Sequence, residues 1–185
     1  GKYDFDGILL TWEQLLDVYA ALMTDHFPNL ISSIEDPFHE DHHDAWRAFG
    51  QRLPQIKRVA DDLTASQLDL AQKYEDLYDI LLLKPNQAGS LVDLMRLVAW
   101  ARQHNKEIII SHRAKEAGTT YKDADLLIAY IAAATGAEWL KTMPRQPVRK
   151  AKVDKLNQLI AKRRARRAAE DRAGETIDGE EAGDE

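Results

Sequence analysis

The sequence predicts an α/β protein built from parallel strand–helix units. Five short apolar segments each end in a charged or polar side chain, and stretches with helical periodicity lie between them. The polar ends, Glu35, Asp61, Lys84, His112 and Lys141, follow one another at intervals of 26, 23, 28 and 29 residues. A strand and a helix repeated at such intervals give parallel strands. Because a closed βα barrel needs eight strands, five units predict part of a barrel or an open α/β sheet.

The predicted strands are short apolar segments, as expected for parallel strands that are covered on both faces. They span 30–34, 56–60, 80–83, 108–110 and, more weakly, 138–140. The spacing of apolar residues predicts helices around 68–74, 91–101 and 126–131, before the third, fourth and fifth strands. A further helix is expected over 12–19 with Thr11 as its N-cap. The four tryptophans, Trp12, Trp46, Trp100 and Trp139, are expected in the core.

Composition narrows the class of protein. The 185 residues contain no cysteine, which fits a reducing cytoplasm and excludes a disulfide framework or a cysteine-based zinc site. No apolar run approaches the roughly 20 residues of a membrane span, and the first residues do not resemble a signal peptide. A net charge of −6 gives no reason to expect a nucleic-acid partner. Since Gly1 replaces an initiator Met, we expect the chain to start within a longer protein.

Charge is unevenly spread near the C-terminus. Residues 149–172 are basic, whereas residues 175–185 contain six acids and no base. This pattern predicts a solvated terminal helix followed by an acidic tail without regular structure after about Ala173. A basic interaction surface is the alternative, and the two blocks could also neutralise each other.

Carboxylates and lysines alternate among the predicted strand ends. Glu35 and Asp61 offer hard oxygen ligands that suit Mg²⁺, although each could instead cap a helix or pair with a lysine. Lys84 could act as a base and Lys141 could hold an anionic carboxylate. Both lysines could instead form salt bridges with Glu35 or Asp61.

Ser111, His112 and Arg113 place a hydroxyl, an imidazole and a guanidinium at the fourth strand end, and arginine suits phosphate recognition. Together the strand ends describe a magnesium site for a small phosphorylated carboxylic acid, with proton abstraction beside the carboxylate. A histidine-rich segment, 39–43, is expected to be a solvated loop rather than a zinc site.

The same segments resemble the enolases, in order, over roughly residues 1–160. The motifs are 1–6 (Gly-Lys-Tyr-Asp-Phe-Asp), 33–38 (Ser-Ile-Glu-Asp-Pro-Phe), 61–64 (Asp-Asp-Leu-Thr), 81–90 (Leu-Leu-Leu-Lys-Pro-Asn-Gln-Ala-Gly-Ser), 111–113 (Ser-His-Arg), 140–142 (Leu-Lys-Thr) and 155–159 (Lys-Leu-Asn-Gln-Leu). The resemblance implies an α/β fold that forms the C-terminal part, about five βα units, of an enolase-type TIM-like barrel, incomplete on its own. Residues 1–160 would form that partial barrel domain and residues 161–185 a charged tail.

The resemblance also implies a function. The reaction would be the reversible, magnesium-dependent dehydration of 2-phosphoglycerate to phosphoenolpyruvate in glycolysis, catalysed by a cytoplasmic lyase that is a homodimer at full length. By resemblance, Lys84 is the base and Glu35 and Asp61 hold Mg²⁺. The resemblance also implies that Lys141 and His112 are catalytic. It implies that the substrate is bound by Glu35, Ser111, His112, Arg113 and Lys141.

Departures from the enolase pattern leave two alternatives open. Ala114 stands where the resemblance expects a phosphate-binding serine, and the stretch from Arg113 to Lys141 is about five residues longer than expected. A third metal carboxylate and the general-acid glutamate would precede Gly1, so the chain is expected to be inactive alone. It could instead be a divergent enolase-like protein that binds a phospho-acid or a protein partner without turnover. A related enzyme acting on another carboxylate is less consistent with the intact 81–87 motif.

Overall fold

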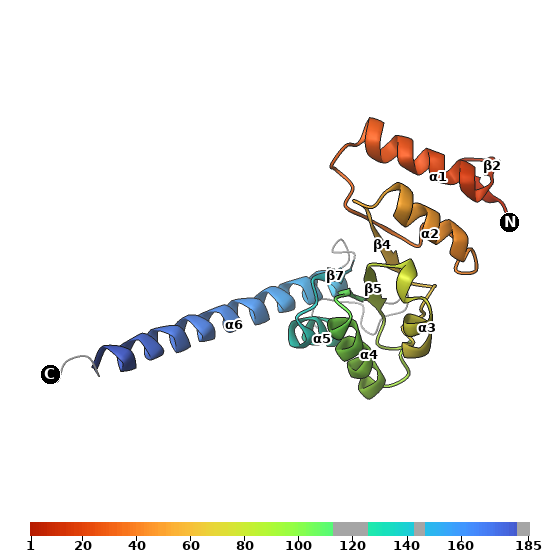
Figure 1. The fold of residues 1–185 in the computed structure, drawn as a ribbon. Coiled ribbons are helices and arrows are strands. Elements are labelled where there is room, and N and C mark those ends of the chain that lie inside the picture. Colours follow the sequence, from red (N-terminus) through yellow and green to blue (C-terminus); the bar gives the residue numbers. More distant parts are fainter. Residues whose placement is uncertain (113–125, 143–146, 181–185) are drawn as a thin grey trace. The chain divides into compact units, whose positions relative to one another are not determined.

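The computed structural model describes residues 1–112, 126–142 and 147–180. The chain divides into two compact units, residues 1–113 and 114–185, which are described separately. Strands and helices alternate along both units (Figure 1). Within the described residues, no helix has the length and apolar character needed to span a membrane.

The first unit is organised around four parallel strands. They are β3 (Ser33–Glu35), β4 (Lys57–Ala60), β5 (Ile80–Leu83) and β6 (Glu107–Ser111), and they lie side by side in chain order. Every residue of β5 is buried, and Ile108 and Ile110 of β6 have no exposed surface. The prediction of strands covered on both faces is confirmed for β5, whereas Ser33 and Glu35 of β3 are exposed.

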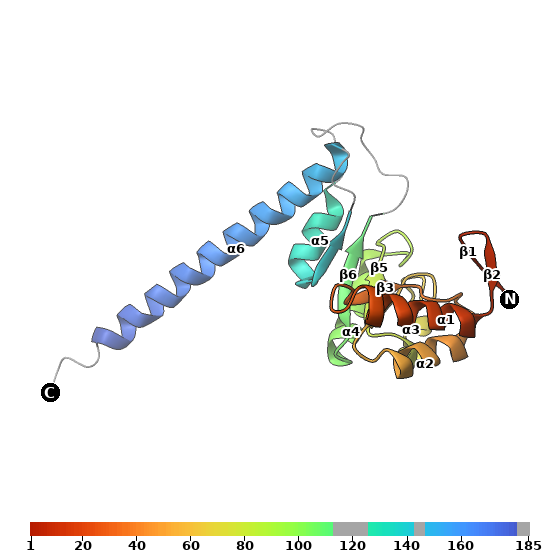
Figure 2. The same cartoon turned by 90° about the horizontal axis from the view of Figure 1, so that it is seen from above.

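Helices follow the strands. They are α1 (Trp12–Ala21) with a π-helical turn (Leu22–His26), α2 (His43–Arg52), α3 (Leu68–Lys73) with a 3₁₀ turn (Glu75–Leu77), and α4 (Leu91–Gln103). The helices α1, α3 and α4 lie at the predicted places, whereas α2 was not predicted. Thr11 caps α1 as predicted: its hydroxyl accepts from the Gln14 amide while the Gln14 side chain accepts from the Thr11 amide. The helices α1 and α2 lie side by side (Figures 1 and 2).

The N-terminal hairpin was missed by the sequence analysis. β1 (Tyr3–Phe5) and β2 (Ile8–Leu10) pair antiparallel across Asp6 and Gly7, both of which have positive φ. An Asp-Gly pair between short strands is a strong hairpin signal, because both central residues of such a turn need that conformation.

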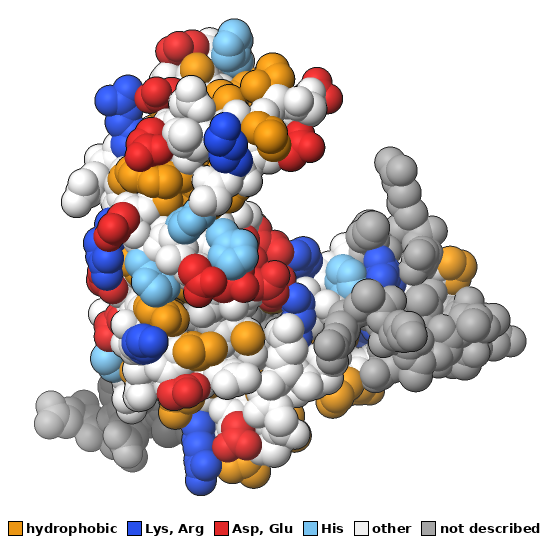
Figure 3. Space-filling model, turned by 90° about the vertical axis from the view of Figure 1, so that its right-hand side faces the viewer, with side chains coloured by type: hydrophobic (Ala, Val, Ile, Leu, Met, Phe, Trp, Pro, Cys, Tyr) orange, Lys and Arg blue, Asp and Glu red, His pale blue; other side chains and the backbone are white. Residues whose placement is uncertain are grey.

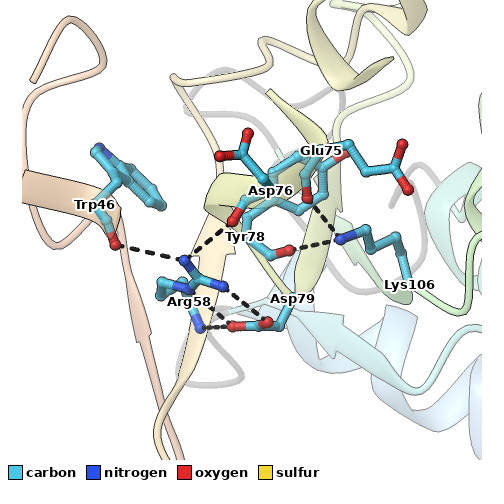
Figure 4. Close-up of polar contacts among 7 residues, drawn as sticks. All are labelled: Trp46, Arg58, Glu75, Asp76, Tyr78, Asp79 and Lys106. Carbon is cyan, nitrogen blue, oxygen red and sulfur yellow. Dashed lines mark hydrogen bonds and ion pairs between the residues drawn. The ribbon is translucent and has the colours of Figure 1, made fainter. Parts of the chain in front are cut away.

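Charged side chains join the amino ends of the strands (Figure 4). The guanidinium of Arg58 donates to both carboxylate oxygens of Asp79 at 3.0 and 3.1 Å, and the Arg58 amide donates to Asp79 at 2.9 Å. The Lys106 ammonium donates to the carbonyls of Glu75 and Tyr78 at 2.7 and 2.8 Å. Burial lowers the pKa of Lys106, although the nearby Asp79 and Glu75 oppose the shift. These contacts tie β4, β5 and β6 together at the end opposite to the predicted site.

The described residues of the second unit, 126–142 and 147–180, form one strand and two helices. They are α5 (Leu127–Thr135), β7 (Trp139–Lys141) and α6 (Pro147–Glu180), with Gly136 ending α5 in the left-handed conformation. The predicted fifth strand is therefore confirmed, and its last residue is Lys141. Trp139 was wrongly expected in the core, since it is 55% exposed, whereas Trp46 and Trp100 are buried.

The helix α6 is longer than the sequence analysis expected. Its backbone is helical as far as Glu180, past Ala173, where irregular structure was predicted (Figure 2). Alanine, arginine and glutamate are strong helix formers, and the ion pair between Arg166 and Glu170, four residues apart at 2.7 Å, adds to them. Charge density alone therefore does not exclude a helix here. Residues 181–185 of the predicted tail lie outside the described residues, and the domain boundary at 160 stays a prediction.

Candidate active site

The carboxyl ends of the parallel strands bring four of the predicted site residues to one edge of the sheet. Glu35 is the last residue of β3, and Asp61, Lys84 and His112 directly follow β4, β5 and β6. Carboxyl ends of parallel strands are where α/β enzymes place their reactive groups. Lys141 ends β7 in the second unit, and Arg113 lies outside the described residues.

An ion pair between Lys84 and Asp61 is the central contact at this edge. The Lys84 ammonium donates to both carboxylate oxygens of Asp61, at 2.7 and 2.6 Å. The two side chains are only 15% and 9% exposed. The salt-bridge alternative for Lys84 is therefore what this structure contains, and the contact also holds an amine within reach of a carboxylate that could bind a metal.

A third carboxylate, Asp36, reinforces the edge and was missed by the sequence analysis. Its two oxygens accept hydrogen bonds from the backbone amides of Asp61 and Asp62, each at 3.0 Å. Burial raises the pKa of Asp36, and the two amides partly offset the shift. Its backbone has a positive φ of 40°, and its amide bonds to the carbonyl of Val59. Asp36 thus fixes the position of the peptide that carries Asp61.

The turn after β4 positions Lys84 from the other side. Ala65 and Ser66 both have positive φ, which turns the Ser66 hydroxyl towards β5. That hydroxyl accepts from the Lys84 amide at 2.9 Å and donates to Gln87 at 3.3 Å, and Ser66 is 2% exposed. The peptide of Lys84 is therefore held by a buried side chain from the neighbouring strand's loop.

The end of β6 supplies the remaining described site residues. Ser111 is 1% exposed, and its hydroxyl donates to the carbonyl of His112 at 3.0 Å. Since that bond is local, the structure gives Ser111 a role in shaping the strand end. His112 is half-buried at the edge, and Glu35 is exposed on β3.

The histidine-rich segment is only partly the loop that was predicted. His39, Glu40 and Asp41 are exposed and follow Pro37. His43 instead begins α2, and its ring packs against the Tyr74 ring with the centroids 4.5 Å apart and the planes tilted by 37°. The His42 ring bonds to the Tyr3 hydroxyl, which also accepts from the His39 amide. Figure 3 shows histidine and acidic side chains gathered on one face of the molecule. Among the described residues, no group that includes these histidines is close enough to hold a metal ion.

Comparison with known proteins decides the family. The family described as "Enolase, C-terminal TIM barrel domain" matches residues 3–177. The chain belongs to the enolase family.

Individual enolases align with most of the chain. Enolase 2 of Lactobacillus johnsonii is 32% identical over 163 residues, which are 86% of this chain and 36% of that protein. The enolase of Methanosarcina mazei is 34% identical over 160 residues, 85% of this chain and 35% of its own length. The chain thus spans about a third of the length of these relatives. The prediction of a partial enolase-type barrel is confirmed.

The donor set of this enolase-family chain fits Mg²⁺. Oxygen atoms of Asp36, Asp61 and Asp62 lie within 4.8 Å of one another, and Mg²⁺ prefers such hard carboxylate ligands. Asp36 and Asp62 were not in the predicted pair of metal ligands. Both oxygens of Asp36 accept hydrogen bonds from backbone amides, and Asp62 is exposed. Asp61 belongs to both sets. The assignment of Glu35 as its partner ligand stays a prediction.

Proposed function

We propose that the protein carrying these residues is a lyase that reversibly dehydrates 2-phosphoglycerate to phosphoenolpyruvate with Mg²⁺, in the cytoplasm and as a homodimer, within glycolysis. The observation that supports this most directly is the ion pair between Lys84 and Asp61 at the carboxyl ends of β5 and β4. A base and a metal carboxylate must be neighbours for proton abstraction beside a metal-bound carboxylate.

Lys84 is the base that takes the C2 proton in this proposal. Its backbone is fixed by Ser66, and its side chain is held by Asp61, so the nitrogen has a defined position. To accept the C2 proton, Lys84 must be present as the neutral amine. Glu35 and Asp61 would hold Mg²⁺, which neutralises negative charge that gathers on the substrate carboxylate. Lys141 contacts that carboxylate, and Ser111, His112 and Arg113 contact the substrate beside it.

The first test is exchange of the C2 proton with solvent, measured in a full-length protein that contains these residues, because the chain is expected to be inactive alone. Lys84→Ala should lower the exchange rate of 2-phosphoglycerate in D₂O by roughly 100- to 10,000-fold, the usual contribution of a general base. Lys57→Ala is the matched control, because Lys57 begins β4 at the other end of the strands and pairs with Glu107. Near-normal exchange in Lys84→Ala would remove the proposed base.

The metal assignment has a separate test. Glu35→Gln keeps the side-chain shape but removes one negative charge, so the Mg²⁺ concentration needed for half-maximal exchange should rise at least about tenfold. Glu107→Gln serves as control, since Glu107 is at the amino end of β6. An unchanged Mg²⁺ dependence would contradict a ligand role for Glu35.

A second candidate function is binding of a phospho-acid or a protein partner without turnover. It is favoured by Ala114, which supplies no hydroxyl where the enolase resemblance expects a phosphate-binding serine. Under the first proposal, Ala114→Ser should leave exchange unchanged or raise it. Calorimetric binding of 2-phosphoglycerate with no measurable exchange, in both the parent and Ala114→Ser proteins, would favour the second.

A further inference from the structure

A groove in the second unit combines apolar walls with a cationic rim. It lies between α5, β7 and α6, at the start of β7, and has a volume of about 470 Å³. Trp139 and Ile160 line it, and they are 55% and 38% exposed. Apolar surface that stays exposed and is rimmed by charged side chains is typical of an interaction site. Lys141, the predicted site residue at the other end of β7, does not line the groove.

One face of α6 runs along the groove. The residues that it contributes follow one another at intervals of one, three or four, so they form a single stripe about 16 Å long. The stripe begins with apolar side chains, where α5 packs against α6, and ends with arginines, where α6 continues past α5 (Figure 2). Its members are Leu156, Leu159, Ile160, Arg163, Arg164 and Arg167.

The arginines of the stripe repel one another. Arg163 and Arg164 have no acidic residue three or four positions away along α6, where helical neighbours lie. Arg167 instead lies four residues after Arg163 and three after Arg164, and like charges at these spacings destabilise a helix. Glu138 also lines the groove, so one carboxylate stands against three guanidinium groups. An anionic partner would relieve this repulsion.

The shape and chemistry of the groove favour a segment of another protein. Its apolar walls include Ala132, Ala133, Leu156 and Leu159, so an apolar side chain fits between α5 and α6. A helix that lays its apolar side into such a groove is a recurring mode of recognition, and arginine binds carboxylates through two parallel hydrogen bonds. A nucleic acid is disfavoured by the net charge of −6, and a hollowed apolar surface fits a side chain better than a flat lipid surface.

We propose that this groove binds an acidic amphipathic helix of a partner protein. One apolar side chain of the partner lies between Trp139 and Ile160, and its carboxylates lie on Arg163, Arg164 and Arg167. About three helical turns of the partner cover the stripe. The complex weakens as salt rises, because the arginines are exposed. This interaction goes beyond the dehydration reaction and does not rest on it.

Peptide selection is the first test, carried out on a full-length protein that contains these residues. The probe is a phage-displayed library of random peptides about 16 residues long, which is enough for four helical turns. The peptides that bind best should carry several Asp or Glu residues together with Leu, Phe or Trp. A best-binding set without acidic residues, or no enrichment at all, would overturn the proposal.

The dissociation constant of one selected peptide, measured by fluorescence anisotropy at about 0.15 M salt, locates its binding surface. Arg163→Glu with Arg164→Glu should weaken binding at least about tenfold. Lys162→Glu with Arg166→Glu changes the net charge equally at residues that do not line the groove, and should change the dissociation constant less than about threefold. Trp139→Ala should also weaken binding at least about tenfold, whereas Trp139→Phe should retain most of it, because an aromatic ring still covers the apolar side chain.

Two further results would overturn the proposal. The first is a dissociation constant that Arg163→Glu/Arg164→Glu leaves unchanged. The second is binding of phosphatidylglycerol vesicles through the same arginines while no selected peptide binds there, which would assign the surface to a membrane. Circular dichroism checks the folding of each variant. If Trp139→Ala fails to fold, the arginine variants still decide, because their side chains are exposed on α6.

Discussion

Replacing Lys84 by Met should destabilise the first unit by about 3 kcal/mol. The substitution leaves the Asp61 carboxylate, only 9% exposed, without the ammonium that now contacts both of its oxygens. Removing one partner of a buried pair typically costs 3–5 kcal/mol, because the other charge stays desolvated. A loss at the lower end of that energy range is expected, because the Lys84 side chain is 15% exposed.

Urea unfolding followed by circular dichroism measures this difference. Lys57→Met is the control, because its pair with Glu107 is 50% and 31% exposed and should contribute less than about 1 kcal/mol. Adding Asp61→Asn to Lys84→Met should recover part of the loss, since no uncompensated charge then remains. If Lys84→Met costs no more than Lys57→Met, the Asp61–Lys84 pair is not the buried contact described here.

Three further perturbations address other contacts. Burial alone would raise the pKa of Asp79, but the hydrogen bonds from Arg58 hold it below its usual value. The stability that this pair contributes is therefore present at neutral pH and is lost as pH falls through the lowered pKa. In Asp79→Asn, the unfolding free energy should therefore fall less steeply as pH is lowered. The difference from the parent should be less than about 1 kcal/mol, because the Asp79 side chain is 40% exposed. An unchanged pH dependence on the acid side would contradict this. Thr11→Ala should cost about 1 kcal/mol in urea unfolding through loss of the α1 cap, whereas Thr11→Ser should cost little. Gly136→Ala should destabilise the second unit by about 1 kcal/mol, because φ is 65° there and alanine is strained in that conformation. The melting temperature should therefore fall, and an unchanged value would show that the turn relaxes.

The sequence predicted the strand ends well because a buried parallel strand has a simple signature. The apolar run 80–83 becomes the fully buried β5, and Lys84 follows it as expected. Thr11 was identified as an N-cap for a similar reason, since the signal lies within a few neighbouring residues. Local patterns of this kind do not depend on the rest of the chain.

The pairing of side chains was harder to predict, because it depends on geometry across strands. Spacing left Lys84 free to pair with either Glu35 or Asp61, and only the register of β4 and β5 selects Asp61. The role of Asp36 depends on its positive φ, which no spacing rule indicates for that residue. Trp139 was misplaced because a three-residue strand does not reveal whether anything covers its outer face.

The separation between the two ends of the sheet has an evolutionary consequence. Arg58, Asp79 and Lys106 fasten the strands at their amino ends, while the loops that carry Lys84 and His112 leave from the carboxyl ends. A substitution or insertion in those loops leaves the Arg58–Asp79 contacts in place. A lineage can therefore alter its substrate contacts step by step and retain a folded sheet at each step. Identities near one third with several enolases agree with such a history.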